Sequence, residues 1–280
     1  MDGLIVDLVG KGIVLPLVLS FVLAGSIRAA LGRPTGAISH SARLDSPTSP
    51  LYGWLPFPPV ASGQKIVYLT MIGLIIGLLL DLRPKARILQ RLATIVWPGI
   101  VVGWLGCRQL TTLSPDALLH LGILRMAGIF VLLQLFRNRG PGPESSIVVL
   151  VAALGASLVA LFGASGSVSQ QFGVIAAAMG GFILWNWPTP RFAFGALGAI
   201  GLGGVLTALA TQTVLFTDAG KTALAITLIV FLTPLLADRV RFAERPALVA
   251  VIFGFVAAVP AILASVVAFI TTGDSFELPI

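Results

Sequence analysis

Nine stretches of this chain are apolar enough and long enough to cross a lipid bilayer, and this pattern limits what the chain can fold into. A span needs about 20 mainly apolar residues to cross a hydrocarbon layer of about 30 Å. Lipid offers the backbone no hydrogen bonds, so such stretches fold as helices. The sequence therefore predicts an all-α polytopic transmembrane bundle of about nine spans, with a range of eight to ten. We expect these spans at 12–31, 66–82, 92–107, 115–136, 146–164, 169–187, 193–215, 222–237 and 247–270.

The composition agrees with this class. Charged residues make up 10% of the chain and hydrophobic residues 57%, whereas a soluble domain has about 25% charged residues. We expect residues 1–280 to form a single integral membrane domain, with the lipid bilayer as its main partner. The net charge of +7 is spread over the connections between spans, which is typical of a topology signal and argues against nucleic acid. The single cysteine, Cys107, excludes an intrachain disulfide and any cysteine-based metal cluster.

The basic residues predict an orientation. With nine spans, the side that holds the N-terminus carries nearly twice as many Lys and Arg residues as the other side. Basic connections are retained in the cytoplasm. We therefore expect a cytoplasmic N-terminus and an extracytoplasmic C-terminus, in a bacterial inner (cytoplasmic) membrane.

One connection is long, and we expect residues 32–64 to form a proline-rich extracytoplasmic loop, because repeated prolines prevent a helix. Tyr52, Trp54 and Phe57 are rings of the kind found where headgroups meet hydrocarbon, and Trp187 ends the sixth span in the same way. The loop is expected either to lie over the outer mouth of the bundle or to serve as a lid or docking strap for a partner.

Arg125 is the most unusual residue of the predicted spans. Its helix has a clear start, with Ser114 as N-cap, Pro115 at the first position and Asp116 in the first turn. Arg125 then falls halfway along, where a guanidinium is costly unless it is paired or hydrated. We expect it to face the bundle interior or a wet cavity. All eleven Asp and Glu residues lie in loops or at span ends, which leaves three roles for Arg125: structural pairing with neutral groups, contact with an anionic substrate, or snorkelling.

Other polar residues are weaker candidates for a solute path. His120 and Gln134 lie on the same expected helix as Arg125. The connection between the fifth and sixth spans is rich in hydroxyls and amides, and discontinuous transporter helices offer such groups to a solute. A tight hydrated turn is the alternative there. The candidates in this connection are Ser165, Ser167, Ser169, Gln170 and Gln171.

Small residues predict close helix packing. Glycines recur every third residue in the seventh span, and small residues four apart allow helices to approach closely in lipid. We expect spans five to seven to form one packed unit, although the same pattern suits a homo-oligomer or a membrane-complex partner. Pro98, Pro234 and Pro260 are expected to bend their helices. The glycines are Gly195, Gly198, Gly201 and Gly204.

The sequence contains no recognisable catalytic signature. There is no phosphate loop, HExxH, cysteine pair or cluster of acids with histidines, so we predict no catalytic residue, metal or cofactor, and an enzyme acting on lipid is the least favoured function. A small-solute permease or channel-like transporter is slightly preferred over a non-catalytic structural or assembly subunit of a larger complex. A polar cavity that reaches Arg125 would favour the permease, and a solid bundle with a flat apolar face the subunit.

Overall fold

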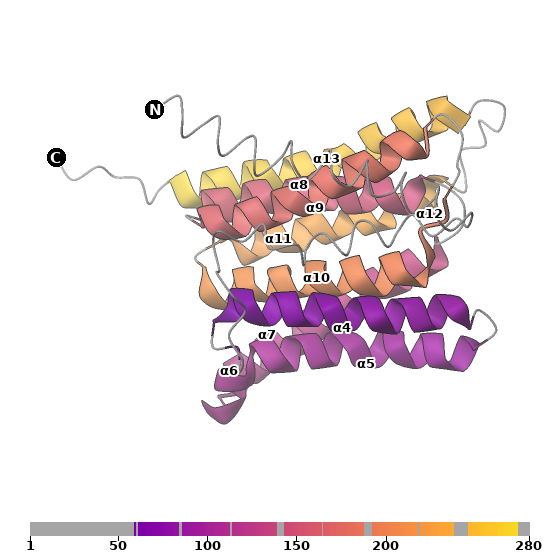
Figure 1. Cartoon of the computed structure of the whole chain (residues 1–280). Coiled ribbons are helices and arrows are strands. Elements are labelled where there is room, and N and C mark those ends of the chain that lie inside the picture. Colours follow the sequence, from indigo (N-terminus) through magenta and orange to yellow (C-terminus); the bar gives the residue numbers. More distant parts are fainter. Residues whose placement is uncertain are drawn as a thin grey trace, which may run out of the picture.

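The computed structural model describes residues 59, 61–83, 86–112, 114–138, 143–163, 165–187, 192–217, 219–237 and 246–273. Within these ranges every element is helical (Figure 1). The long helices are α4 (Ser62–Leu82), α5 (Arg87–Leu105), α7 (Pro115–Arg137), α8 (Glu144–Phe162), α9 (Gly166–Trp185), α10 (Gly195–Phe216) and α13 (Pro246–Gly273). The short ones are α6 (Cys107–Thr112), α11 (Lys221–Thr227), η2 (Leu228–Leu232) and α12 (Thr233–Ala237).

All seven long helices contain a segment long and apolar enough to cross a membrane. Within the described residues the predicted all-α class is confirmed, and the seven long apolar helices are compatible with a membrane-spanning bundle. Most of the expected boundaries hold within a few residues, but α5 starts earlier than the predicted 92, and α4 begins at Ser62, inside the predicted loop. The first expected span, at 12–31, the loop up to residue 58, and Tyr52, Trp54 and Phe57 lie outside the described residues.

The eighth expected span, at 222–237, is not one continuous helix. It consists of α11, the 3₁₀ segment η2 and α12 in succession. Pro234 accounts for the interruption: it has no N–H to donate to the carbonyl of Val230, and its ring crowds that carbonyl. The tighter 3₁₀ winding over Leu228–Leu232 avoids the conflict, and a 3₁₀ stretch inside a helix often marks a hinge.

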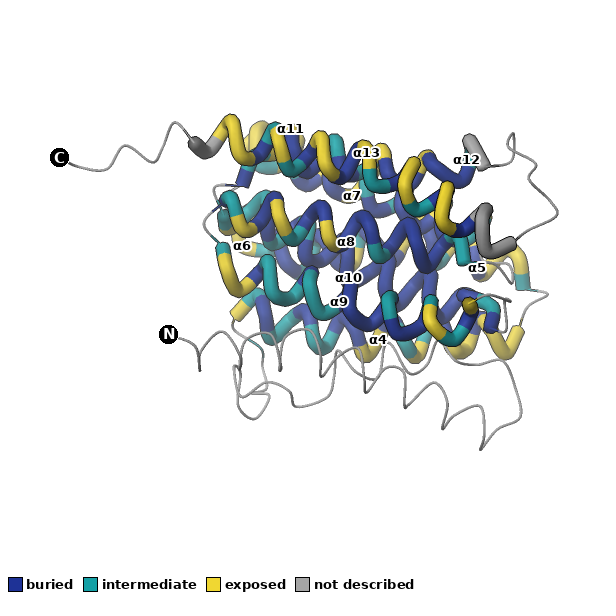
Figure 2. Tube along the Cα trace, turned by 90° about the horizontal axis from the view of Figure 1, so that it is seen from above, coloured by how far each residue is buried: buried dark blue, intermediate teal, exposed yellow. Residues whose placement is uncertain are grey.

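Burial follows the arrangement expected of a bundle in lipid. Figure 2 shows buried residues at the centre of the bundle and exposed ones around its rim. Many of the exposed residues are large and apolar, such as Ile88, Phe255 and Ile270. Water would make such a rim unfavourable, whereas acyl chains would not. α10 is the central helix, with 78% of its most apolar window buried.

Glycines set the packing of α10, but not against the helices that the sequence suggested. α10 contacts α4, α7 and α5 extensively and α9 much less, so spans five to seven do not form one packed unit. Gly204 lies directly against the indole of Trp97 on α5. From α4, Gly77 lies so close to α10 that a Cβ there would be 2.6 Å from the Cα of Leu197. α8 instead pairs closely with α9 and with α13.

Charges at the two ends of α4 bind the ends of its neighbours. Asp81 accepts hydrogen bonds from the backbone N–H groups of Ala196 (2.7 Å) and Leu197 (2.9 Å) at the start of α10. Lys65 donates to the carbonyl of Trp104 (3.2 Å) at the end of α5. An acid at a helix N-terminus and a base at a C-terminus are both favourable. α4 is thus fixed to α10 at one end and to α5 at the other.

Candidate functional site

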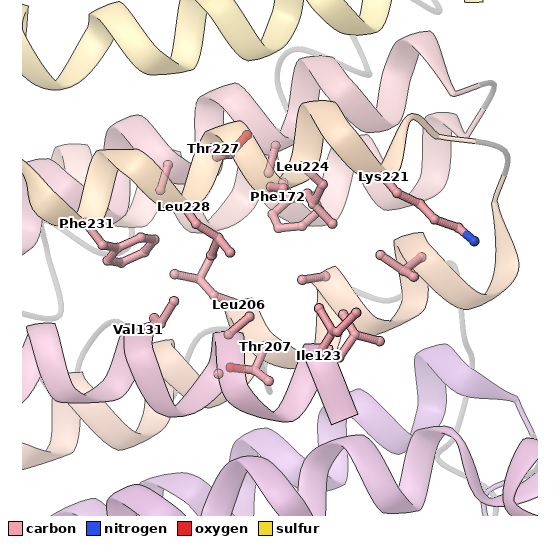
Figure 3. A pocket seen from close by; sticks show the side chains of 18 of the residues that line it. Ile123, Val131, Phe172, Leu206, Thr207, Lys221, Leu224, Thr227, Leu228 and Phe231 are labelled. Carbon is pink, nitrogen blue, oxygen red and sulfur yellow. The ribbon is translucent and has the colours of Figure 1, made fainter. Parts of the chain in front are cut away.

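A cavity of about 310 Å³ lies inside the bundle among α7, α8, α9, α10 and the segmented helix α11–η2 (Figure 3). Phe172 of α9 and Phe231 of η2 are buried in its wall. The other wall residues are mainly aliphatic or small: Ile123, Leu124, Ala127, Gly128, Val131, Ala152, Ala156, Leu206, Thr207, Ala210, Val214, Leu224, Ala225, Thr227 and Leu228.

The cavity is hollow because its walls carry small side chains where helices would otherwise interlock. α8 contributes only Ala152 and Ala156, and Ala210 is among the residues that α10 contributes. At Gly128 of α7, by contrast, the helices are in close contact, since a Cβ there would lie 2.7 Å from Thr207. The space is therefore a property of the alanines and not of loose packing between the helices.

The two threonine hydroxyls in the wall already donate hydrogen bonds to backbone carbonyls of their own helices. Thr207 donates its hydroxyl to the carbonyl of Gly203 (2.7 Å) and Thr227 donates to the carbonyl of Ala223 (3.1 Å). Each keeps lone pairs, but neither has a proton left for a solute. The deep part of the cavity therefore suits an apolar body.

The only ionisable side chains among the described lining residues are at one end. Lys221, the first residue of α11, donates to Nε2 of His120 at 3.1 Å. The Nδ1 of His120 lies 2.7 Å from the carbonyl oxygen of Asp116. A carbonyl only accepts and an ammonium only donates, so this arrangement fits the His120 tautomer with its proton on Nδ1. Figure 3 shows the side chain of Lys221 at the edge of the apolar wall, with its nitrogen directed away from the other labelled side chains. Lys221 is exposed and supplies one positive charge at this end.

The opposite end is closed by α7 packing on α10. A Cβ at Gly203 would lie 3.2 Å from Leu135 and 3.4 Å from Leu132, and both leucines are buried. The cavity therefore ends in close packing on the side away from Lys221.

The sequence-derived candidates are placed unevenly around this cavity. His120 lines it, but Arg125 does not: its side chain is exposed and lies over Gly99 of α5, with Nε 3.4 Å from the position of a Cβ there. Within the described part of the bundle Arg125 thus does not face the interior, and the other alternative, that it faces a wet cavity, stays a prediction. Gln134 is half-buried outside the cavity, and no described atom donates to its buried Oε1.

The candidates at the α8–α9 connection also lie away from the cavity lining. Ser157 of α8 donates to the carbonyl of Ser169 (2.8 Å), and their hydroxyls are 3.0 Å apart. Ser169 thus links two helices, Ser165, Gln170 and Gln171 are half-buried, and Ser167 is exposed. Sequence reasoning missed Lys221, because a lysine at a span end is common, and missed the alanine wall, because alanines are common in any membrane helix.

The remaining candidates have packing or surface positions. Gly198 packs on the ring of Phe194, Gly201 is buried, and Trp187 is exposed after the end of α9. Gly195 has a positive φ of 68°, which glycine adopts at little cost. A Cβ at Gly195 would also lie 2.7 Å from Oδ2 of Asp81, so this glycine permits the contact between α4 and α10.

These features define an all-helical bundle of the membrane-protein class, with an apolar cavity that carries one cation at its end. No protein-family model matches the chain, and no curated protein matches its sequence.

Proposed function

We propose that this protein is a permease for a small, largely apolar solute that carries one acidic group. The observation that supports this most strongly is the cavity itself, with an apolar body and the exposed Lys221 as the one Lys or Arg among its described lining residues. An acidic group would bind Lys221 through a charge-assisted hydrogen bond. The rest of the solute would then occupy the alanine-lined space without leaving a polar group unsatisfied.

The size of the cavity limits the solute. A volume of about 310 Å³ is at the lower end of the range of ligand sites. It corresponds to roughly ten water-sized groups at ~30 Å³ each. A single short alkyl chain or one aromatic ring with an acidic group fits this limit, and a two-chain phospholipid does not.

The segmented helix supports transport in addition to binding. α11 and η2 form one wall of the cavity, and the junction at Thr227 and Leu228 lies in that wall. A change of winding in η2 would move this wall. For the solute to leave at the opposite end, Gly203 would have to separate from Leu132 and Leu135. Membrane transporters commonly use broken helices at their solute sites. An assembly subunit would not need a central cavity, and we therefore favour the permease.

Equilibrium binding tests the proposal. Purified protein in lipid nanodiscs would be mixed with radiolabelled octanesulfonate, with empty nanodiscs as background. We expect Lys221→Met to weaken binding about tenfold, the equivalent of ~1.4 kcal/mol, and Ala156→Phe to abolish it by filling the cavity. The matched controls are Arg108→Met, an exposed cation of α6, and Gly173→Leu, where α9 has open space.

Two results would contradict the proposal. One is equal binding of octyltrimethylammonium, which has the same chain and the opposite charge. The other is equal weakening by Lys221→Met and Arg108→Met, because a general loss of surface charge would then explain the effect.

We further propose that the Lys221 end is extracytoplasmic and that the membrane is a bacterial inner membrane, from the distribution of basic residues. Cys107 lies at the same end of α4 and α5 as Lys65, whose Nζ is 3.5 Å from its Sγ. A membrane-impermeant maleimide should label Cys107 in intact cells. Arg87 lies at the other end of α5. The variant Arg87→Cys, made together with Cys107→Ala, should react with the maleimide only after the cells are opened. The reverse pattern would invert the orientation.

A further inference from the structure

A second hollow, of about 680 Å³, lies on the outer surface between α7 and η2. Its lining is apolar, and several members, such as Leu119, Met126 and Ile229, are strongly exposed. In a bilayer this surface would contact acyl chains, because water would not solvate it favourably. The hollow therefore belongs to the lipid-facing side of the bundle.

The outer hollow and the inner cavity share part of their walls. Ile123 and Ala127 of α7 and Leu228 of η2 line both. These three side chains alone are common to the two linings, so they form the partition between the cavity and the lipid-facing surface. Ala127 contributes only a methyl group to it, and Ile123 is 58% exposed.

The partition also lies where the winding changes from α-helical to 3₁₀. Leu228 is the first residue of the 3₁₀ segment, and α11 is held mainly by α13 and not by α7. α7 is a continuous helix without an internal proline. η2 itself contacts α7, α8 and α13, so a shift of η2 that displaced Leu228 from α7 would connect the two hollows and would also change the contacts of η2 with α8 and α13.

We propose that the solute enters the cavity sideways from the lipid phase, between Ala127 and Leu228. This inference rests on the proposed function and specifies its substrate class: a membrane-dissolved single-chain amphiphile with an anionic head. The position of Lys221 agrees with this route, since it is the first residue of α11, about 10 Å from Leu228 at 1.5 Å rise per residue. An anionic head would stay at the end of the bundle near Lys221 while the chain passes between α7 and η2.

The rate of entry tests the route separately from binding. The association rate of radiolabelled octanesulfonate with the protein in nanodiscs would be followed by rapid filtration. We expect Leu228→Ala, which thins the partition, to speed association about threefold to tenfold, and Ala127→Phe, which thickens it, to slow association by a similar factor. The matched control is Ala258→Phe. It fills a lipid-facing hollow between α8 and α13 that has no lining residue in common with the cavity.

A second measurement varies the lipid at constant free octanesulfonate. Entry from the membrane predicts a rate that follows the concentration of the probe dissolved in the bilayer. If the rate follows the free aqueous concentration and neither partition variant changes it, the solute enters from water at the Lys221 end and the route is wrong. Absence of equilibrium binding to the unaltered protein would instead refute the proposed function itself, so the two failures are distinguishable.

Discussion

Asp81 accepts a 2.7 Å hydrogen bond from the backbone N–H of Ala196, although 115 residues separate them in the chain. The side chain of one helix thus caps another helix from outside. Helix starts usually find a cap in the residue that precedes them. The residue before α10 is Phe194, which has no side-chain hydrogen-bond acceptor. Asp81 supplies the missing acceptor for two of the first N–H groups of α10.

Replacing Asp81 should therefore loosen the contact between α4 and α10. We expect Asp81→Ala to lower the free energy of unfolding by about 1 kcal/mol, the usual value of an N-cap. Asp81→Asn should lose less, because it keeps one acceptor oxygen. The measurement is thermal unfolding in mild detergent, with Asp116→Ala on the exposed first turn of α7 as control. An equal effect of both alanine variants would contradict the capping role.

Gly77 should tolerate substitution poorly, because a Cβ there would lie 2.6 Å from the Cα of Leu197. The backbone of α10 fills the space that a Cβ at Gly77 would occupy, and a backbone cannot move aside as a flexible side chain can. We expect Gly77→Ala to destabilise the bundle by about 1–3 kcal/mol, as overpacking does. Gly173→Ala, in open space on α9, should be neutral or stabilise by about 0.5–1 kcal/mol from helix propensity. Thermal unfolding of the two variants side by side provides the comparison.

Ser169 should act in stability and not in solute binding. Ser157→Ala should destabilise the α8–α9 pair by about 0.6 kcal/mol, typical of a hydrogen bond between membrane helices. Ser169→Ala should cost less, because the backbone carbonyl of Ser169 still accepts from Ser157. The double variant should lose less than the sum, because both changes break the same contact. Octanesulfonate affinity should stay unchanged in all three. A lower octanesulfonate affinity in Ser169→Ala would contradict this and indicate that Ser169 contacts the solute.

Arg125→Gln should leave octanesulfonate affinity unchanged, since Arg125 lies over Gly99 and outside the cavity. A neutral side chain should also favour accumulation in the membrane, because a guanidinium at the middle of a span costs about 2.5–3.5 kcal/mol on insertion scales. The measurements are binding and the amount of folded protein extracted from membranes. Reduced affinity in a fully folded variant would bring Arg125 back as a solute contact.

The class of fold and most helix boundaries could be predicted from sequence, because apolar length is a local property of the chain. Ser114, Pro115 and Asp116 predicted the start of α7 for the same reason: Oγ of Ser114 accepts from the N–H of Ala117 at 3.3 Å. The interruption at Leu228–Leu232 was less visible, because a proline in a membrane span more often produces only a bend.

The candidate site could not be predicted in the same way, because it depends on which helices are neighbours. Arg125 stood out as a charge in an apolar span, but its direction is set by the packing of α7 against α5. The glycines of α10 indicated a close approach and not the partner, which is α4 and α5. Neither Ala156 nor Lys221 indicates a binding site when read alone in the sequence. Only the fold brings them together at one cavity.

Solute flux into sealed proteoliposomes tests the central claim most directly. Purified protein would be reconstituted, and uptake of radiolabelled octanesulfonate compared among the unaltered chain, Lys221→Met, Ala156→Phe and the control Arg108→Met. The account predicts uptake well above that of protein-free liposomes, strongly reduced by the first two variants and kept by the control. Uptake equal to that of protein-free liposomes, or unaffected by filling the cavity with Ala156→Phe, would contradict it.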